Sequence, residues 1–292
     1  MTAYPASDPA LIADAARERR FFLSLSVPAL VIVGLSAVLP ILWILRQSFL
    51  NIGGDATLAN WSKILNSGLT WSAMQTTFLL SGSTLVICVI LGTPLALALA
   101  STTPRKANLL MIFLLLPLWT SILVRTYGWL VLLRREGLIN GALQGIGLTS
   151  EPMPLVYNTT GVLVGMVHYM LPLYVLPVYA AMRDIDGSVV RAAASMGATL
   201  GQAIRTVILP LARGGIVSGS IIVFVYTLGF FITPAVLGGG KVNPIAIRIE
   251  RTIGAFQDWG GASVLGMLLL LTVALVGAMV LALRRVAGVR HA

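Results

Sequence analysis

The stretch RAAASMGATLGQAIRTVILP occupies residues 191–210 and separates two long apolar segments of the chain. It is rich in alanine and glycine and closes on a Leu-Pro pair, whereas neither apolar segment, 160–182 or 216–237, contains a charged residue. Small residues, a central glycine and a closing proline are typical of short helices joined by a tight turn. The stretch therefore predicts a helical elbow between two segments of a very different kind.

The chain as a whole is too apolar for a water-soluble domain. Hydrophobic residues make up 57% of its 292 residues, charged residues only 10%, and the mean hydropathy is +0.92. A soluble domain carries about 25% charged residues. Because so few charges cannot cover a surface that faces water, the composition favours a protein embedded in a membrane.

Six apolar stretches are long enough to cross a bilayer as helices, since about 20 residues span its hydrocarbon core. None contains Asp or Glu, and one contains a basic residue, Arg125. The first follows a basic cluster, but its length of about 25 residues exceeds that of a signal peptide, so we interpret it as an uncleaved helix. We predict an all-α polytopic membrane protein with transmembrane helices at 21–45, 77–100, 109–133, 160–182, 216–237 and 262–283.

The distribution of basic residues orients this bundle. With the N-terminus inside, twelve Lys and Arg residues lie on the inner side and seven on the outer side, which with Arg125 makes the 20 of the chain. The excess predicts cytoplasmic termini and explains the net charge of +10 without a nucleic-acid partner. The expected organisation is a cytoplasmic tail (1–20), a first transmembrane helix with a periplasmic loop (21–76), a membrane core (77–285) with a cytoplasmic loop (183–215), and a cytoplasmic tail (286–292).

The sequence shows no set of residues that could carry out catalysis or hold a metal. It has two histidines, one cysteine and no zinc-binding motif, and the GGGK at 238–241 lacks the Ser or Thr that a phosphate-binding loop needs, since Val242 follows. We therefore expect no enzyme activity, no metal and no cofactor in this chain. Ion-coupled carriers usually need intramembrane acids, which the spans lack, so energy for transport would have to arrive through another protein.

The elbow predicts two short helices. Asp186 and Ser188 are candidates for the N-cap, Gly197 permits a sharp turn, and a second helix over about residues 200–208 ends at Pro210. On physical grounds alone, this elbow is either a docking surface for a partner or an ordinary connecting loop.

The same segment resembles a motif of the inner-membrane subunits of binding-protein-dependent ABC importers. That motif reads E-A-A, three residues, G, nine residues, I-x-L-P, and the matching positions are Ala192, Ala193, Gly197, Val207 in place of Ile, Leu209 and Pro210. The resemblance covers about residues 21–285. Shorter stretches are similar to permeases of the polyamine (spermidine/putrescine) type: LPLWTSILVRTYGW at 116–129, GLIN at 137–140 and LGFFITPAVLGG at 228–239.

This resemblance implies a type I ABC importer permease (MetI-like) fold in a bacterial inner membrane. It implies that the elbow docks on a cytoplasmic ABC ATPase dimer, which binds ATP and Mg. It also implies a second, homologous permease subunit and a periplasmic solute-binding protein that delivers a small organic solute, first a polyamine and otherwise an opine or amino-acid derivative. A membrane-embedded enzyme or an ion-coupled carrier is the alternative. The implied docking residues are Arg191, Ala192, Ala193, Gly197, Ala198, Leu200, Arg205, Leu209 and Pro210.

One position departs from the family pattern, because Arg191 stands where the motif has Glu. Ser188 lies three residues earlier, so the usual pair would form a capping box that Arg cannot complete. A cation in the first turn also costs roughly 0.3–1 kcal/mol against the helix dipole. The hypothesis is that Arg191 instead faces an acidic residue of the ATPase.

Aromatic residues and Arg125 are candidates for the solute path. A straight third span would carry Arg125 about 24 Å from the inner edge, where it either snorkels outward or lines an outer vestibule. Aromatic faces suit ammonium groups, but Phe230 stands where some polyamine-type relatives have an acid, which weakens a cationic solute. Helix packing, or the interface for Tyr127 and Trp129, is the alternative role. The candidates are Trp119, Arg125, Tyr127, His168, Tyr169, Tyr226 and Phe230.

Overall fold

The computed structural model describes residues 9–51 and 53–289, most of them helical, with no strand among them beyond an isolated bridge between Leu50 and Ala56. Residues 1–8 and 290–292 of the expected tails lie outside the described residues. The helices in chain order are α1 (Pro9–Ser48), α2 (Ala59–Leu65), α3 (Gly68–Ala100), α4 (Pro104–Trp119), α5 (Ile122–Leu133), α6 (Leu138–Gly145), α7 (Thr159–Arg183), α8 (Gly187–Ser195), α9 (Leu200–Ala203), the π-helix η1 (Ile204–Ile208), α10 (Leu209–Leu211), α11 (Arg213–Leu228), α12 (Ile232–Leu237), α13 (Ile245–Gly254) and α14 (Trp259–Val289).

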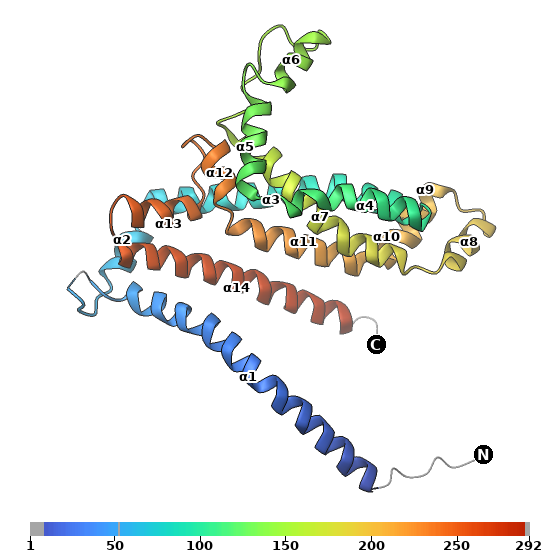
Figure 1. Ribbon diagram of the computed structural model, residues 1–292, viewed down its shortest axis with the longest axis horizontal. Helices are drawn as coiled ribbons and strands as arrows, with labels where there is room; N and C mark the ends of the chain where they lie inside the picture. The colour runs from blue at the N-terminus through green and yellow to red at the C-terminus, as the bar shows by residue number, and fades with distance from the viewer. Residues whose placement is uncertain (1–8, 52, 290–292) are drawn as a thin grey trace.

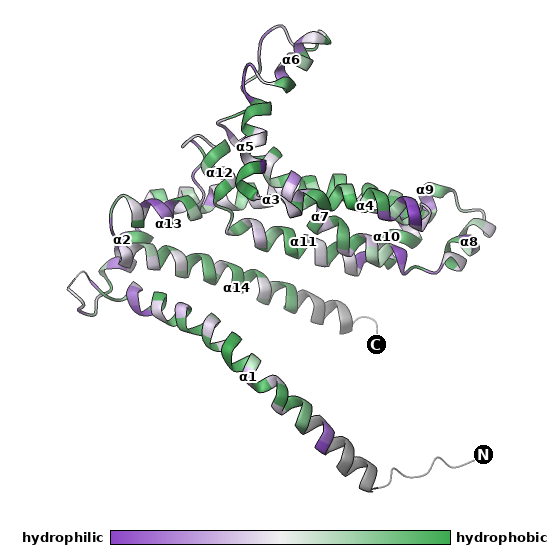
Figure 2. Ribbon diagram, viewed as in Figure 1, coloured by the Kyte–Doolittle hydropathy of each residue, from purple (hydrophilic) through white to green (hydrophobic). Residues whose placement is uncertain are grey.

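Most of the long helices run roughly parallel, as membrane spans do, whereas α1 slants away from them (Figure 1). Four of the long helices, α1, α3, α7 and α14, are long and apolar enough to cross a membrane. Two bent pairs raise the number to six if each is one span: α4 with α5–α6, and α9–α10 with α11. Figure 2 shows the hydrophobic colouring running along these helices and hydrophilic residues gathering mainly near their ends. The all-α, six-span architecture expected from the sequence is thereby confirmed.

Two predicted spans are interrupted. The third, expected at 109–133, breaks at Thr120 and Ser121, whose extended backbone turns the chain by 99° between α4 and the α5–α6 segment. The fifth, expected at 216–237, stops at Leu228 and resumes as α12. A continuous helix there would press the ring of Pro234 against the carbonyl of Phe230, which explains the second break.

The two terminal spans reach further than expected. Helix α1 begins at Pro9, inside the segment assigned to the N-terminal tail, and α14 extends to Val289, inside the C-terminal one. α1 packs mainly on α14, where Trp43 and Trp259 meet edge to face at 6.3 Å, and the two helices diverge from there (Figure 1). None of the most apolar part of α1 is buried within the subunit.

The core of the subunit is the packing of α3, α7 and α11. Tyr174 of α7 is completely buried there, and its hydroxyl lies 2.8 Å from that of Thr93 on α3. Lipid tails are as apolar as the side chains, so the hydrophobic effect does not drive membrane helices together. Hydrogen bonds and close packing of this kind hold them instead.

Helices α7 and α11 approach closely at Gly215. A Cβ atom there would lie 2.4 Å from the carbonyl oxygen of Pro177 and 2.5 Å from the Cβ of Ala181. Real side chains do not tolerate such distances, so the helix pair depends on the missing side chain.

We predict that Gly215→Ala lowers the stability of the purified chain in detergent by about 1–3 kcal/mol, because one methyl group overfills the contact between helices. Gly214→Ala is the matched control, because its Cβ would meet nothing within 4 Å. Thermal unfolding followed by intrinsic fluorescence measures both variants. Equal melting temperatures for the two variants would contradict the packing described.

Candidate functional site

The elbow joins α7 to α11 and comprises α8, α9, η1 and α10. Figure 1 shows α8 and α9 at the end of the bundle toward which α1 and α14 direct the termini, opposite α2 and α13. If the termini are cytoplasmic, the elbow projects into the cytoplasm.

Backbone capping fixes the first half of the elbow. The Asp186 carboxylate accepts a hydrogen bond of 2.8 Å from the Ser188 N–H at the start of α8. At the other end Gly197 has φ +86°, its N–H donates to the carbonyl of Ala194, and the Ala198 N–H donates to that of Ala193. This is the Schellman arrangement, so the turn predicted at Gly197 is confirmed.

A capping box that the sequence reasoning missed fixes the second half. The Thr199 N–H donates to the side chain of Gln202 at 2.8 Å, and the Gln202 N–H donates back to the Thr199 hydroxyl at 3.4 Å. The T-x-x-Q pattern was the available signal. The helix does not end at Pro210, which lies in the first turn of α10 where a missing N–H is tolerated, and α10 continues to Leu211.

Asp186, not Ser188, is the N-cap of α8, so the capping argument made for Arg191 was wrong. Arg191 lies beyond the first turn, where the dipole penalty fades. Its guanidinium folds back along α8 to Gly187. A Cβ atom added to Gly187 would be 3.1 Å from the Arg191 Nη1. Hydrogen bonds from the Ser188 backbone and side chain, together with the Arg191 charge, hold the pKa of Asp186 below its ordinary value.

The expected docking residues divide by exposure. Ala193 is only 6% exposed and packs inside the elbow, while Leu209 packs against the helical core, so these two shape the elbow from within. The tip presents apolar side chains instead: Met196 is 83% exposed and Leu200 75% exposed. Met196 was not among the expected residues. The remaining positions lie at the surface or are half-buried: Arg191, Ala192, Gly197, Ala198, Arg205 and Pro210.

At the break in the third span, Arg125 acts as a cap. Its guanidinium donates to the carbonyls of Pro117 and Thr120, at the C-terminal end of α4, where a cation also suits the helix dipole. The depth predicted for Arg125 was wrong, because it assumed a straight helix through Thr120. The guanidinium carbon also lies 4.6 Å from the ring centroid of Tyr169.

Three residues from two spans form what we call the aromatic cluster: Tyr169, Tyr226 and Phe230. The Tyr169 ring lies 5.7 Å from each of the other two rings, and the two tyrosine hydroxyls are 3.1 Å apart. Phe230 reaches the cluster because it occupies the break between α11 and α12. The structure thus brings together four of the expected path residues, including Arg125.

The other three path candidates lie elsewhere. His168 accepts a hydrogen bond of 3.0 Å on Nδ1 from the indole of Trp129, which joins α7 to α5. Tyr127 is 54% exposed and Trp119 90% exposed, and neither makes an aromatic contact within the described part of the chain.

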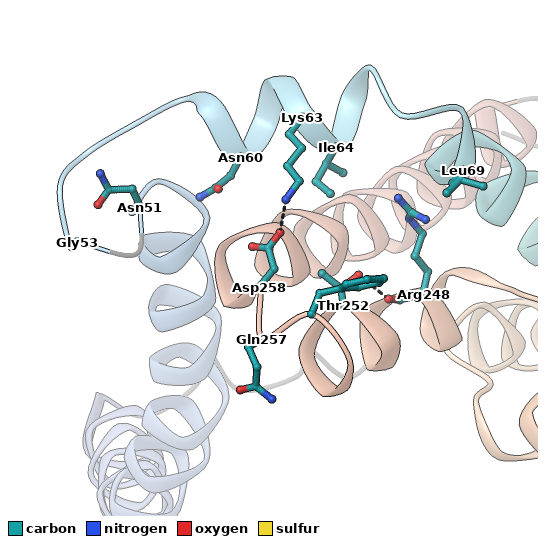
Figure 3. A pocket seen from close by; sticks show the side chains of 11 residues that line it. Asn51, Gly53, Asn60, Lys63, Ile64, Leu69, Arg248, Thr252, Gln257 and Asp258 are labelled. Atoms are coloured by element: carbon teal, nitrogen blue, oxygen red, sulfur yellow. Dashed lines mark hydrogen bonds and ion pairs between the residues drawn. The ribbon is translucent and has the colours of Figure 1, made fainter.

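A hollow of about 660 Å³ lies at the opposite, outer end of the bundle, between the end of α1, α2 and α13. Figure 3 shows Lys63 of α2 meeting Asp258, at 2.8 Å, beside it. Partial burial raises the pKa of Asp258, but hydrogen bonds from Lys63 and the Gly261 N–H outweigh this and hold it below its usual value. The sequence reasoning did not find this hollow.

Residues 89–288 match the family described as binding-protein-dependent transport system inner membrane component. The spermidine/putrescine transport system permease protein PotB of Haemophilus influenzae is 30% identical over 245 residues, which cover 80% of this chain and 84% of that protein. A bacterial ABC transporter involved in the import of the acidic polysaccharide alginate has the same fold, with a TM-score of 0.70 and 18% identity over 92% of this chain and 98% of that chain. A second structure of the alginate transporter, in complex with a pentasaccharide-bound periplasmic protein, matches with a TM-score of 0.68 and 18% identity over 91% and 93% of the two chains.

We predict that Gly197→Ala loosens the elbow, because its left-handed backbone costs an alanine roughly 1 kcal/mol. Gly201→Ala is the control, because Gly201 lies in α9 with no positive φ and a Cβ there would meet nothing within 4 Å. Hydrogen exchange of the purified chain should be faster over residues 186–211 in the first variant only. Equal exchange in both variants would contradict the capping assignment.

Proposed function

The chain belongs to the binding-protein-dependent transport system inner membrane components, and from that premise we propose that it forms the solute pathway of an ATP-driven importer together with a second permease. Membership confirms the sequence-based identification of an ABC importer permease. It is a multi-pass protein of the bacterial inner membrane and a transport component rather than an enzyme.

The observation that carries the proposed mechanism is the form of the elbow. Its caps are formed by its own residues, while its tip exposes Met196 and Leu200, two apolar side chains that the described part of the subunit leaves largely uncovered. Apolar groups presented on a rigid element favour a partner surface. We assign this tip to a groove on a cytoplasmic ATPase, which would bind ATP and Mg on its own residues.

The elbow also has the right connections to transmit a movement. It leads directly from α7 into α11, and both helices pack in the core beside the aromatic cluster. ATP can drive transport only by favouring one arrangement of these helices over another. A displaced elbow would move two core helices at once.

We expect Met196→Asp with Leu200→Asp to reduce uptake by the whole importer at least tenfold, because two buried charges oppose an apolar contact. Val189→Asp is the matched control, because Val189 is an exposed apolar residue at the start of α8. Uptake and solute-stimulated ATP hydrolysis are measured in vesicles with equal amounts of each variant. Normal coupling in the double variant would refute docking at the tip.

A periplasmic binding protein and a second, homologous permease complete the proposed importer. The binding protein is supported by family membership and by the alginate transporter, whose structure includes a periplasmic protein. The second permease is supported by α1, whose apolar surface is left uncovered within one subunit. Both partners are proposed as separate chains.

For the solute, a polyamine is the first candidate, because a spermidine/putrescine permease, PotB, is 30% identical over 80% of this chain. One observation favours the second class, an opine or amino-acid derivative. Arg125 already covers a face of Tyr169 that an ammonium group would need, and it presents a positive charge that suits a carboxylate.

Arg125→Gln separates the two solute classes. For a solute with a carboxylate, uptake should fall roughly tenfold or more, since a charge-assisted hydrogen bond is lost, and Arg125→Lys should retain part of it. For a polyamine, Arg125→Gln should lower uptake much less than this, because the removal of a repelling charge offsets the loss of the α4 cap. The solute tested is the one that copurifies with the cognate binding protein, identified by mass spectrometry, at matched membrane abundance of each variant.

A further inference from the structure

A second hollow lies at the outer end of the bundle, beside the one in Figure 3, and Arg248 lines both. Its volume is about 210 Å³. We call it the cationic pocket, because three basic side chains and no acidic one line it. Its lining residues are Leu69, Ser72, Ala73, Thr76, Lys241, Asn243, Ile247, Arg248 and Arg251.

Rigid elements hold these side chains. The hydroxyl of Thr77 on α3 accepts a hydrogen bond of 2.9 Å from the Ile245 N–H, which ties the first residue of α13 to α3. Arg248 and Arg251 lie three residues apart and so share one face of α13. The Arg251 guanidinium lies near the turn before Lys241. A Cβ atom added to Gly240 would be 3.9 Å from the Arg251 Nη2.

Among the residues that the structure describes, the charges of the pocket have no acidic partner. The ion pair found among the described residues joins Lys63 to Asp258, so none of the three cations of the pocket has a carboxylate within 4.0 Å. The Arg248 Nη2 donates to the Ser67 hydroxyl at 3.1 Å, but its Nε is buried without a hydrogen-bond partner. Partial burial lowers the pKa of Arg248, whereas Lys241 and Arg251 are exposed.

The placement of these cations runs against the usual bias. Basic residues favour the cytoplasmic side, whereas this pocket lies at the opposite end of the bundle from the termini. Trp71, half-exposed at the start of α3 one residue before Ser72, suits the level of the lipid headgroups. Like charges crowded in one small pocket repel one another unless an anion lies between them.

We propose that the cationic pocket binds a phosphate group, supplied either by a lipid headgroup of the outer leaflet or by free phosphate. Two guanidinium groups offer planar forks that match phosphate oxygens, and Lys241 adds a point charge. Ser72 and Thr76 line the same pocket; the Ser72 hydroxyl adds a donor, whereas the Thr76 hydroxyl already donates to the Ser72 carbonyl at 2.9 Å. Free phosphate carries about two negative charges, which balance three cations better than the single charge of a carboxylate, whereas a lipid phosphodiester carries one. The proposal does not depend on the solute or on the ATPase.

The test measures the melting temperature of the full-length chain, delipidated in dodecyl maltoside, at constant ionic strength. The probes are inorganic phosphate and phosphatidylglycerol, with dioleoylglycerol as the uncharged lipid. The pocket variant is Lys241→Gln/Arg248→Gln/Arg251→Gln. The control removes three basic residues of the predicted outer segments that do not line the pocket, Arg46→Gln/Arg134→Gln/Arg135→Gln.

We expect a saturable rise of roughly 3 °C or more in the wild type and the control, and less than about 1 °C in the pocket variant. A rise with phosphatidylglycerol alone assigns the phosphate to lipid, and a rise with inorganic phosphate as well assigns it to a free anion. Because phosphate stabilises many proteins without binding them, an equal rise in all three chains overturns the proposal, as does no rise in the wild type. If the triple variant does not fold, the double variant Lys241→Gln/Arg251→Gln is used in its place, because it keeps the Arg248–Ser67 hydrogen bond.

Discussion

The whole structure depends on one constraint: a backbone group in hydrocarbon needs a hydrogen-bond partner from the protein itself. Continuous helices meet it along α3 and α7. Where the third span opens at Thr120, the guanidinium of Arg125 and the Thr120 hydroxyl supply donors to the exposed end of α4. Near the end of α11, the Thr227 hydroxyl donates to the carbonyls of Val223 and Phe224.

These breaks place the aromatic cluster. Without the first break, Arg125 would continue along a straight span, and without the second, Phe230 would lie inside a helix. Instead both reach Tyr169, which α7 holds in the core. The elbow is built by a different rule, since its caps satisfy its backbone in water and leave its tip free for a partner.

The sequence predicts most of the architecture because apolar length and basic asymmetry are strong signals. It also predicts the turn at Gly197, because few other residues adopt a left-handed backbone there. It does not predict where a span breaks, and the depth assigned to Arg125 failed for that reason. The choice of Ser188 over Asp186 as the cap failed because both residue types suit the position and only the helix start distinguishes them. The meeting of Tyr169, Tyr226 and Phe230 depends on long-range packing that no periodicity records.

The central claim is that energy enters this subunit through the tip of the elbow. A photoreactive benzoylphenylalanine at position 196 or 200, introduced into the full chain in intact cells, tests it most directly. The account predicts that irradiation joins the chain to an ABC ATPase, identified by mass spectrometry, and that the same group at position 189 gives little of this product. An adduct with the ATPase from position 189 but from neither tip position would contradict the account.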